Sequence, residues 1–230
     1  MFDDQVDALR AVGHRVVTWD MRAHGLSRPN TVAITGPRLL ADAETLVDEV
    51  GLEQPLLVGH SLGGNIAQAL VRRRPGAYAG LVVIDSTWNT GPLSRWERRM
   101  LRLAAPALRA IPAVALPGVM ARASAVTSRA RADLRRAFAQ VTKSEFLAVW
   151  EATTSFVTPN PSYRTPLPLL LVRGDRDRTG NIARAMHAWA AHDGAREAVI
   201  DGAGHVPTLD APVAVTSALL AFLDSLERLR

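Results

Sequence analysis

Cysteine is absent from this 230-residue sequence. Its absence excludes disulfide bonds, thiolate zinc sites and a cysteine nucleophile. Long hydrophobic runs are missing as well: no apolar stretch approaches the ~18 residues that a transmembrane helix needs, which argues against a membrane span. The first ten residues, "MFDDQVDALR", carry acidic side chains where a secretory signal would need basic ones and then an apolar core. We therefore expect a cytoplasmic protein.

Lysine is almost absent too, since Lys143 is the only one, and arginine supplies nearly all of the basic charge. The net charge of +5 is uneven: residues 88–165 hold twelve basic and four acidic side chains, and the rest of the chain holds fifteen and eighteen. Arginines spread over solvated helix faces are the simpler explanation; attraction of acidic substrates or of an anionic membrane surface is the alternative. The run Arg72 to Arg74, followed by Pro75, is typical of a helix end, and we expect no nucleic-acid partner.

Short apolar runs alternate with amphipathic stretches over most of the chain, and 230 residues are enough for one large domain. The runs predict about five buried parallel strands, at 15–19, 55–59, 80–85, 167–174 and 197–201. The amphipathic stretches predict crossover helices at 2–11, 38–50, 63–74, 181–192 and 211–229. The pattern therefore predicts an α/β fold with a mostly parallel, doubly wound sheet flanked by helices.

Residues 88–165 break this alternation. They form Ala/Leu/Arg-rich helical pieces that six prolines interrupt. We therefore predict that residues 1–87 and 166–230 form the core and that 88–165 form an inserted helical cap.

The stretch "LLVGHSLGGNIAQAL", residues 57–71, passes from an apolar run through a glycine-flanked serine into a helical pattern. In the pattern G-x-S-x-G, formed here by Gly59, Ser61 and Gly63, the glycines permit a cramped strand-to-helix turn that projects the serine hydroxyl above the sheet. The free amides of the helix N-terminus favour developing negative charge there, and the Leu62 N–H is the candidate oxyanion donor. An ordinary turn is the alternative, but the strand before the motif and the helix after it favour a nucleophile.

A serine nucleophile needs a base to accept its proton and an acid to orient that base. His205, in "IDGAGHVPTLDAP", stands on a glycine-containing loop just after a predicted strand, where open α/β sheets build their sites. His187 and His192 fall on a predicted helix, where a surface role is more common. His205 is therefore the candidate base.

The candidate acids also follow a strand: "LVRGDRDRTG" contains Asp175 and Asp177, although a solvated turn would use the same residues. A calcium loop is a rival interpretation of this segment. It fails because the twelfth position is Met186, where a bidentate glutamate is required, so we expect no metal.

The order of serine, acid and histidine resembles that of the α/β-hydrolase superfamily. "VGHSLGGNIA" is similar to its nucleophile elbow, "RGDRD" to its acid loop, "GAGHVP" to its histidine loop, and "VVTWDMRAHGLS" to the segment before the elbow, with Ala23 where glycine is common. The resemblance covers nearly the whole chain outside 88–165, which matches a cap that covers the pocket in relatives. It implies Asp177 as the acid, in the pattern G-x-x-D, with Asp85 at the end of "LVVID" as the alternative position.

The sequence departs from the family at its front. Family members begin with a hairpin and a strand that ends in a His-Gly loop, whose backbone amide is the second oxyanion donor. The absent strand would lie between 15–19 and 55–59, so we expect either that these two strands pair directly or that the sequence is the remainder of a longer protein. Loss of one oxyanion donor costs about 10²- to 10³-fold in turnover.

We therefore expect a serine hydrolase that cleaves an ester, lactone or similar acyl bond of a small-molecule substrate without a cofactor. Ser61 attacks, His205 transfers the proton, Asp177 orients His205, and Leu62 N–H stabilises the oxyanion. Epoxide hydrolases and haloalkane dehalogenases place an aspartate at the elbow, so Ser61 argues against both, whereas acyltransfer and perhydrolysis use the same triad. The second hypothesis is a catalytically weak or inactive hydrolase-like protein or an N-terminally truncated fragment. Acyl length and oligomeric state are left open.

Overall fold

The structure is a computed structural model that describes residues 1–228, apart from the side chain of Arg102. Within these residues four parallel strands form one sheet in the order β1-β2-β3-β4. The strands are β1 (Leu56–His60), β2 (Gly80–Ile84), β3 (Leu169–Gly174) and β4 (Arg196–Ile200). The helices are α1 (Asp3–Ala11), α2 (Gly36–Glu49), α3 (Leu62–Arg73), α4 (Arg95–Ala110), α5 (Leu116–Ser124), α6 (Ser128–Phe138), α7 (Lys143–Ser155), α8 (Ile182–Asp193), α9 (Pro207–Asp210) and α10 (Pro212–Glu227).

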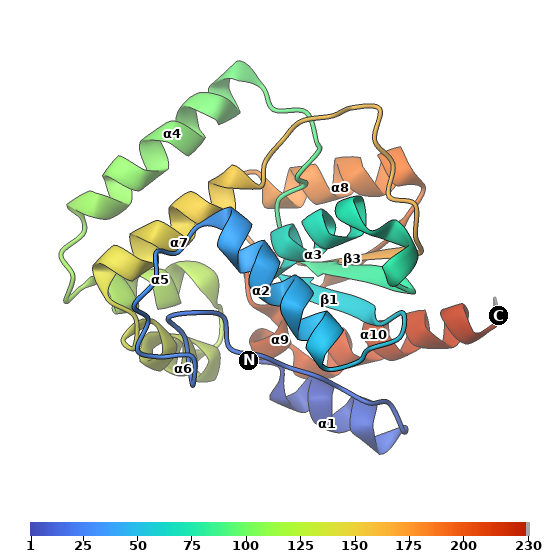
Figure 1. Cartoon of the computed structure of the whole chain (residues 1–230). Helices are drawn as coiled ribbons and strands as arrows, with labels where there is room; N and C mark the ends of the chain where they lie inside the picture. The colour runs from blue at the N-terminus through green and yellow to red at the C-terminus, as the bar shows by residue number, and fades with distance from the viewer. Residues whose placement is uncertain (229–230) are drawn as a thin grey trace.

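The sheet lies between two layers of helices, as Figure 1 shows. Successive side chains of a strand point to opposite faces, so each central strand contributes to two cores. Val83 and Leu171 belong to the larger core, with residues of α2, α3 and α8. Val82 and Leu170 face the other way and pack with residues of α10. The predicted α/β fold with a parallel sheet is confirmed, and all of its strands run toward the same edge.

Helices α4 to α7 occupy the chain between β2 and β3, within the predicted insertion at 88–165. Figure 1 shows them on one side of the sheet, with α4 outermost. Both α4 and α7 begin with a capping box, in which the side chains of Ser94 and Thr142 accept from the backbone of Glu97 and Glu145. Local sequence therefore fixes where these helices start. That they cap a substrate pocket stays a prediction.

One predicted strand is wrong: residues 15–19 form no strand and pair with no strand of the described chain. The alternative of direct pairing with 55–59 is therefore wrong as well. A cavity of about 730 Å³ lies between the two segments, lined by 14–19 on one side and by 54–58 on the other. Because paired strands lie about 4.8 Å apart, this space prevents a ladder. As a result β1 is an edge strand, and Val58 in its centre is 36% exposed.

The five predicted helices are present as α1, α2, α3, α8 and α10, with ends shifted by one or two residues, and of these α3 and α8 connect neighbouring strands. The prediction 211–229 extends into residue 229, which lies outside the described residues. Of the helices in the described chain, none has both the length and the apolar character that crossing a bilayer requires.

Candidate active site

Ser61 stands in the sharp turn between β1 and α3. Its backbone has φ 51° and ψ −118°, a conformation that L residues rarely adopt and that is found mostly at functional sites. The Ser61 N–H donates to the Ile84 carbonyl at 2.9 Å, which holds the turn against the neighbouring strand β2. The turn therefore lifts the serine side chain above the carboxyl edge of the sheet, as the motif predicts.

The glycines around Ser61 differ in what they do. A Cβ on Gly59 would overlap the carbonyl group of Gly63, and a Cβ on Gly64 would lie 2.6 Å from Cβ of Ser86. A Cβ on Gly63 would meet nothing within 4 Å. Gly59 therefore permits the close approach of the end of β1 to the start of α3, and Gly64 permits the contact of α3 with the loop after β2, whereas the G-x-S-x-G pattern contains Gly59 and Gly63.

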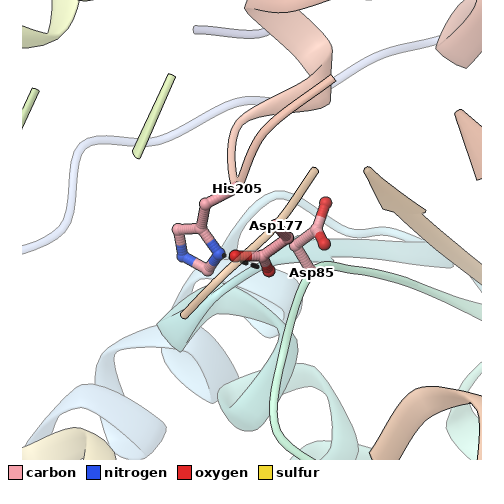
Figure 2. A group of neighbouring side chains, drawn as sticks. All are labelled: Asp85, Asp177 and His205. Atoms are coloured by element: carbon pink, nitrogen blue, oxygen red, sulfur yellow. Dashed lines mark hydrogen bonds and ion pairs between the residues drawn. The ribbon is translucent and has the colours of Figure 1, made fainter. Parts of the chain in front are cut away.

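His205 lies between Ser61 and Asp177, although the three residues are far apart in the sequence. Its Nε2 is 3.0 Å from the Ser61 Oγ, and its Nδ1 is 3.0 Å from Oδ2 of Asp177. Figure 2 shows the imidazole facing the Asp177 carboxylate, with Asp85 beside it. Both distances lie within the range expected for hydrogen bonds, so a proton can move from the serine hydroxyl to the imidazole while the carboxylate fixes the ring.

Asp177 is held as an anion by its hydrogen bonds. Burial alone would raise its pKa, but the hydrogen bond from His205 and the Thr179 N–H, which donates to Oδ1 at 2.7 Å, outweigh burial and lower the pKa to about 2. A carboxylate that stays ionised at neutral pH stabilises the imidazolium that forms when His205 accepts a proton.

Asp85 follows β2 and is completely buried next to Asp177. Both of its carboxyl oxygens accept from the Gly174 N–H, at 3.0 and 3.2 Å. Burial, followed by the charge of Asp177, raises the pKa of Asp85 to about 10. Two adjacent buried carboxyl groups avoid a double negative charge when one stays protonated. Asp85 is therefore a neutral neighbour of the acid, and Asp177 is the carboxylate in contact with the imidazole.

His60, the variable residue of the serine motif, supports the histidine loop, a role that the sequence did not reveal. Its Nε2 lies 2.6 Å from the backbone oxygen of His205, and the two rings are 5.0 Å apart. Burial, followed by the charge of His205, lowers the pKa of His60 to about 3. A neutral His60 with its proton on Nε2 donates to this carbonyl and fixes the backbone of His205.

Asp210 is a second supporting residue that sequence reasoning missed. Its carboxylate accepts from the N–H groups of Gly204, Val126 and Thr127 at 2.8–3.1 Å. These bonds tie the loop that carries His205 to the turn between α5 and α6. The only signal in the sequence was a carboxylate five residues after the candidate histidine.

Leu62 is the first residue of α3. The first four N–H groups of an α-helix have no acceptor within the helix, so the Leu62 amide lies where the turn presents donors next to Ser61. His187 and His192, which the sequence places on a helix and not in the site, contact other groups: His187 contacts Glu197 at 3.0 Å, and His192 contacts the Tyr163 carbonyl at 3.0 Å.

A metal is the alternative use of the cluster, because one ligand atom each of Asp85, Asp177 and His205 lie within 4.8 Å of one another. The donor chemistry fits a metal poorly. Both ring nitrogens of His205 already contact protein atoms, and a protonated Asp85 is a weak ligand. The arrangement fits proton transfer better.

Comparison with known proteins gives a family match over most of the chain. The sequence model of the "Alpha/beta hydrolase family" matches residues 1–218. An sn-1-specific diacylglycerol lipase of Mus musculus is 38% identical over 77 residues, which are 34% of this chain and 25% of the lipase. The acetyltransferase component of an acetoin cleaving system from Cupriavidus necator is 27% identical over 221 residues, which are 87% of this chain and 54% of that protein.

Among solved structures, an esterase from Thermogutta terrifontis superimposes with a TM-score of 0.76 at 23% identity, over 98% of this chain and 85% of the esterase. This likeness concerns the fold. The matched part of the chain spans about a quarter of the length of the mouse relative and about half of the Cupriavidus relative.

Proposed function

This chain belongs to the alpha/beta hydrolase family, and on that premise we propose that it is a serine hydrolase that cleaves an ester, lactone or similar acyl bond through a Ser61–His205–Asp177 triad. The observation that carries the proposal is that His205 lies within hydrogen-bond distance of both partners, 3.0 Å from the Ser61 Oγ and 3.0 Å from the Asp177 carboxylate. The small-molecule acyl substrate and the cytoplasmic location stay predictions.

In the proposed reaction the Ser61 Oγ attacks the carbonyl carbon while its proton passes to Nε2 of His205. Asp177, ionised because its pKa is about 2, stabilises the imidazolium through Nδ1. The amide of Leu62 donates to the oxyanion, and His205 returns the proton to the leaving group. Water then attacks the acyl-enzyme with His205 as base, which regenerates Ser61.

A catalytically weak hydrolase-like protein is the second candidate. It is favoured by the separation of residues 15–19 from β1, because in the described chain no strand end lies beside Ser61 on that side to supply a second oxyanion amide. Lack of one such donor lowers turnover by about 10²- to 10³-fold, so the triad would be retained with little activity.

A fluorophosphonate probe tests the proposal, because it reacts covalently with an activated serine. We expect labelling at Ser61 that Ser61→Ala abolishes. Ser217→Ala, at an exposed serine on α10, is the matched control and should label like the wild type. No labelling of a protein that circular dichroism shows to be folded would refute the triad. Labelling with negligible hydrolysis of p-nitrophenyl esters would favour the second candidate.

A further inference from the structure

Helix α4 presents three large apolar side chains to solvent. Trp96, Met100 and Leu103 are 67%, 45% and 49% exposed. At 100° per residue their spacing of four and three places them within an arc of about 60°, so they form one narrow stripe along the helix. We call Trp96, Met100 and Leu103 the α4 stripe. An exposed apolar cluster of this kind marks an interaction surface more often than a lone exposed residue does.

Polar contacts hold the helix in this orientation at its N-terminus. Glu97 points inward, with 15% of its side chain exposed, and accepts from Asn181 and Arg184 near the start of α8. Burial alone would raise its pKa, but hydrogen bonds from Ser94, Asn181 and Arg184 lower it to about 2, so the carboxylate stays charged. The charged residue is thus turned toward the protein and its neighbour Trp96 toward solvent.

The C-terminus of α4 is anchored in the same way. Arg109 forms an ion pair with Glu151 of α7 at 2.7 Å, and Nζ of Lys143 donates to the carbonyls of Arg109 and Ile111 at 2.6 Å. Figure 1 shows α4 as the outermost element on this side of the molecule. The α4 stripe is therefore displayed by a helix that is fixed at both ends.

Positive charge flanks the stripe. Arg95, Arg98 and Arg99 are exposed and belong to none of the ion pairs found among the described residues. On the helical projection Arg99 and Arg95 fall about 60° and 100° to one side of Trp96, whereas Arg98 falls about 160° from Trp96, on the opposite side of the helix. An exposed stripe of Trp, Met and Leu with arginines beside it has the pattern of helices that lie in the interface of an anionic bilayer, where tryptophan sits at the headgroup level and arginines contact phosphates.

We propose that α4 docks this protein on anionic lipid surfaces, with the α4 stripe in the interface and Arg95 and Arg99 on lipid phosphates. The charge next to the stripe selects this partner: a second copy of the chain would place the same arginines against each other, and a neutral apolar partner would leave them unused. The proposal does not depend on the triad, so Ser61→Ala should bind lipid as the wild type does.

Co-sedimentation with vesicles tests the proposal. The wild type should bind vesicles of phosphatidylcholine mixed with phosphatidylglycerol, and binding should weaken with added salt and be much lower on phosphatidylcholine alone. The charge variant Arg95→Gln/Arg99→Gln should lower the partition coefficient by roughly 25-fold, since each cation near such a surface contributes about fivefold. Trp96→Ser/Met100→Ser/Leu103→Ser should abolish binding.

The matched control is Val114→Ser/Val213→Ser, which removes two apolar residues that are 93% and 78% exposed away from the stripe and should bind normally. Binding that the stripe variant retains, or absence of wild-type binding, would overturn the proposal. So would a dimer in light scattering that the stripe variant dissociates, because a second copy would then cover the stripe. A large fall in the free energy of unfolding of the stripe variant would show instead that the stripe packs within the fold.

Discussion

The variant Asp85→Asn tests whether the carboxyl group of Asp85 is neutral or charged in the folded protein. Asparagine has the same shape, keeps an oxygen that can accept from the Gly174 N–H, and offers an amide donor toward Asp177, but it cannot ionise. Burial and the nearby charge of Asp177 raise the pKa of Asp85 to about 10, so the native residue is already protonated at neutral pH. We therefore expect Asp85→Asn to keep kcat/KM at pH 7 within about threefold, the loss that a weakened hydrogen bond would cause.

The same substitution should change how stability depends on pH. In the unfolded chain the pKa of Asp85 falls near 3.9, so between pH 5 and 9 the native state binds one proton more than the unfolded state. The stability that this proton contributes is fully present below pH 3.9 and is lost as the pH rises toward 10. At about 1.4 kcal/mol per pH unit, the loss from pH 5 to pH 9 reaches about 5 kcal/mol in the wild type. Asp177 does not change the stability between pH 5 and 9, because its native pKa near 2 and its unfolded pKa near 3.9 both lie below this range.

Urea denaturation at pH 5, 7 and 9 measures this difference. As the pH rises, the free energy of unfolding of Asp85→Asn should increase relative to that of the wild type, because only the wild type loses the contribution of the Asp85 proton. Asp85→Ala, which leaves the Gly174 amide without its acceptor, should be less stable at every pH. Parallel pH profiles of the wild type and Asp85→Asn would refute the protonated carboxyl group. A loss of activity in Asp85→Asn as large as that in Asp85→Ala would show that the charge of this residue is used.

Two further substitutions test the supports of the site. Gly64→Ala should destabilise the protein by about 1–3 kcal/mol and lower probe labelling, because the new Cβ would lie 2.6 Å from Cβ of Ser86, whereas Gly63→Ala should keep the stability or raise it by about 0.5–1 kcal/mol. Thermal unfolding of the two variants measures this difference, and equal effects would contradict the steric argument. Asp210→Ala should lower the free energy of unfolding in urea by about 2–4 kcal/mol and reduce kcat/KM, because the Gly204 amide beside the candidate base loses its acceptor. An unchanged kcat/KM would show that the histidine loop is positioned without Asp210.

The sequence predicted which residues of the candidate site lie together better than it predicted the sheet. Ser61, Asp177 and His205 each follow a β-branched apolar run, and parallel strands bring their carboxyl ends to one edge, so position after a strand was enough to bring them together. A strand, by contrast, exists only when a neighbour pairs with it. Residues 15–19 have the composition of a strand, but the space beside β1 leaves them without a partner, and composition carries no information about that space.

The supporting residues escaped prediction for a related reason. His60 and Asp210 act on backbone groups, the carbonyl of His205 and the amide of Gly204, and backbone groups leave no mark in a sequence. Asp85 was recognised only as an alternative acid, because its neutral state depends on complete burial beside Asp177, a property of the folded chain.

Hydrogen bonds to the sheet hold two strained backbone conformations in the candidate site. Ser61 and Asp85 have positive φ angles of 51° and 38°, and both come directly after a strand. Such conformations cost about 1–3 kcal/mol each and persist only where the surroundings fix them. Here the Ser61 N–H donates to Ile84 and the Asp85 N–H to Val172, both at 2.9 Å, so each turn continues the ladder of the adjacent strand before it bends. The sheet edge therefore holds Ser61 and Asp85 in place before any substrate arrives, which is the preorganisation that the proposed acyl transfer requires.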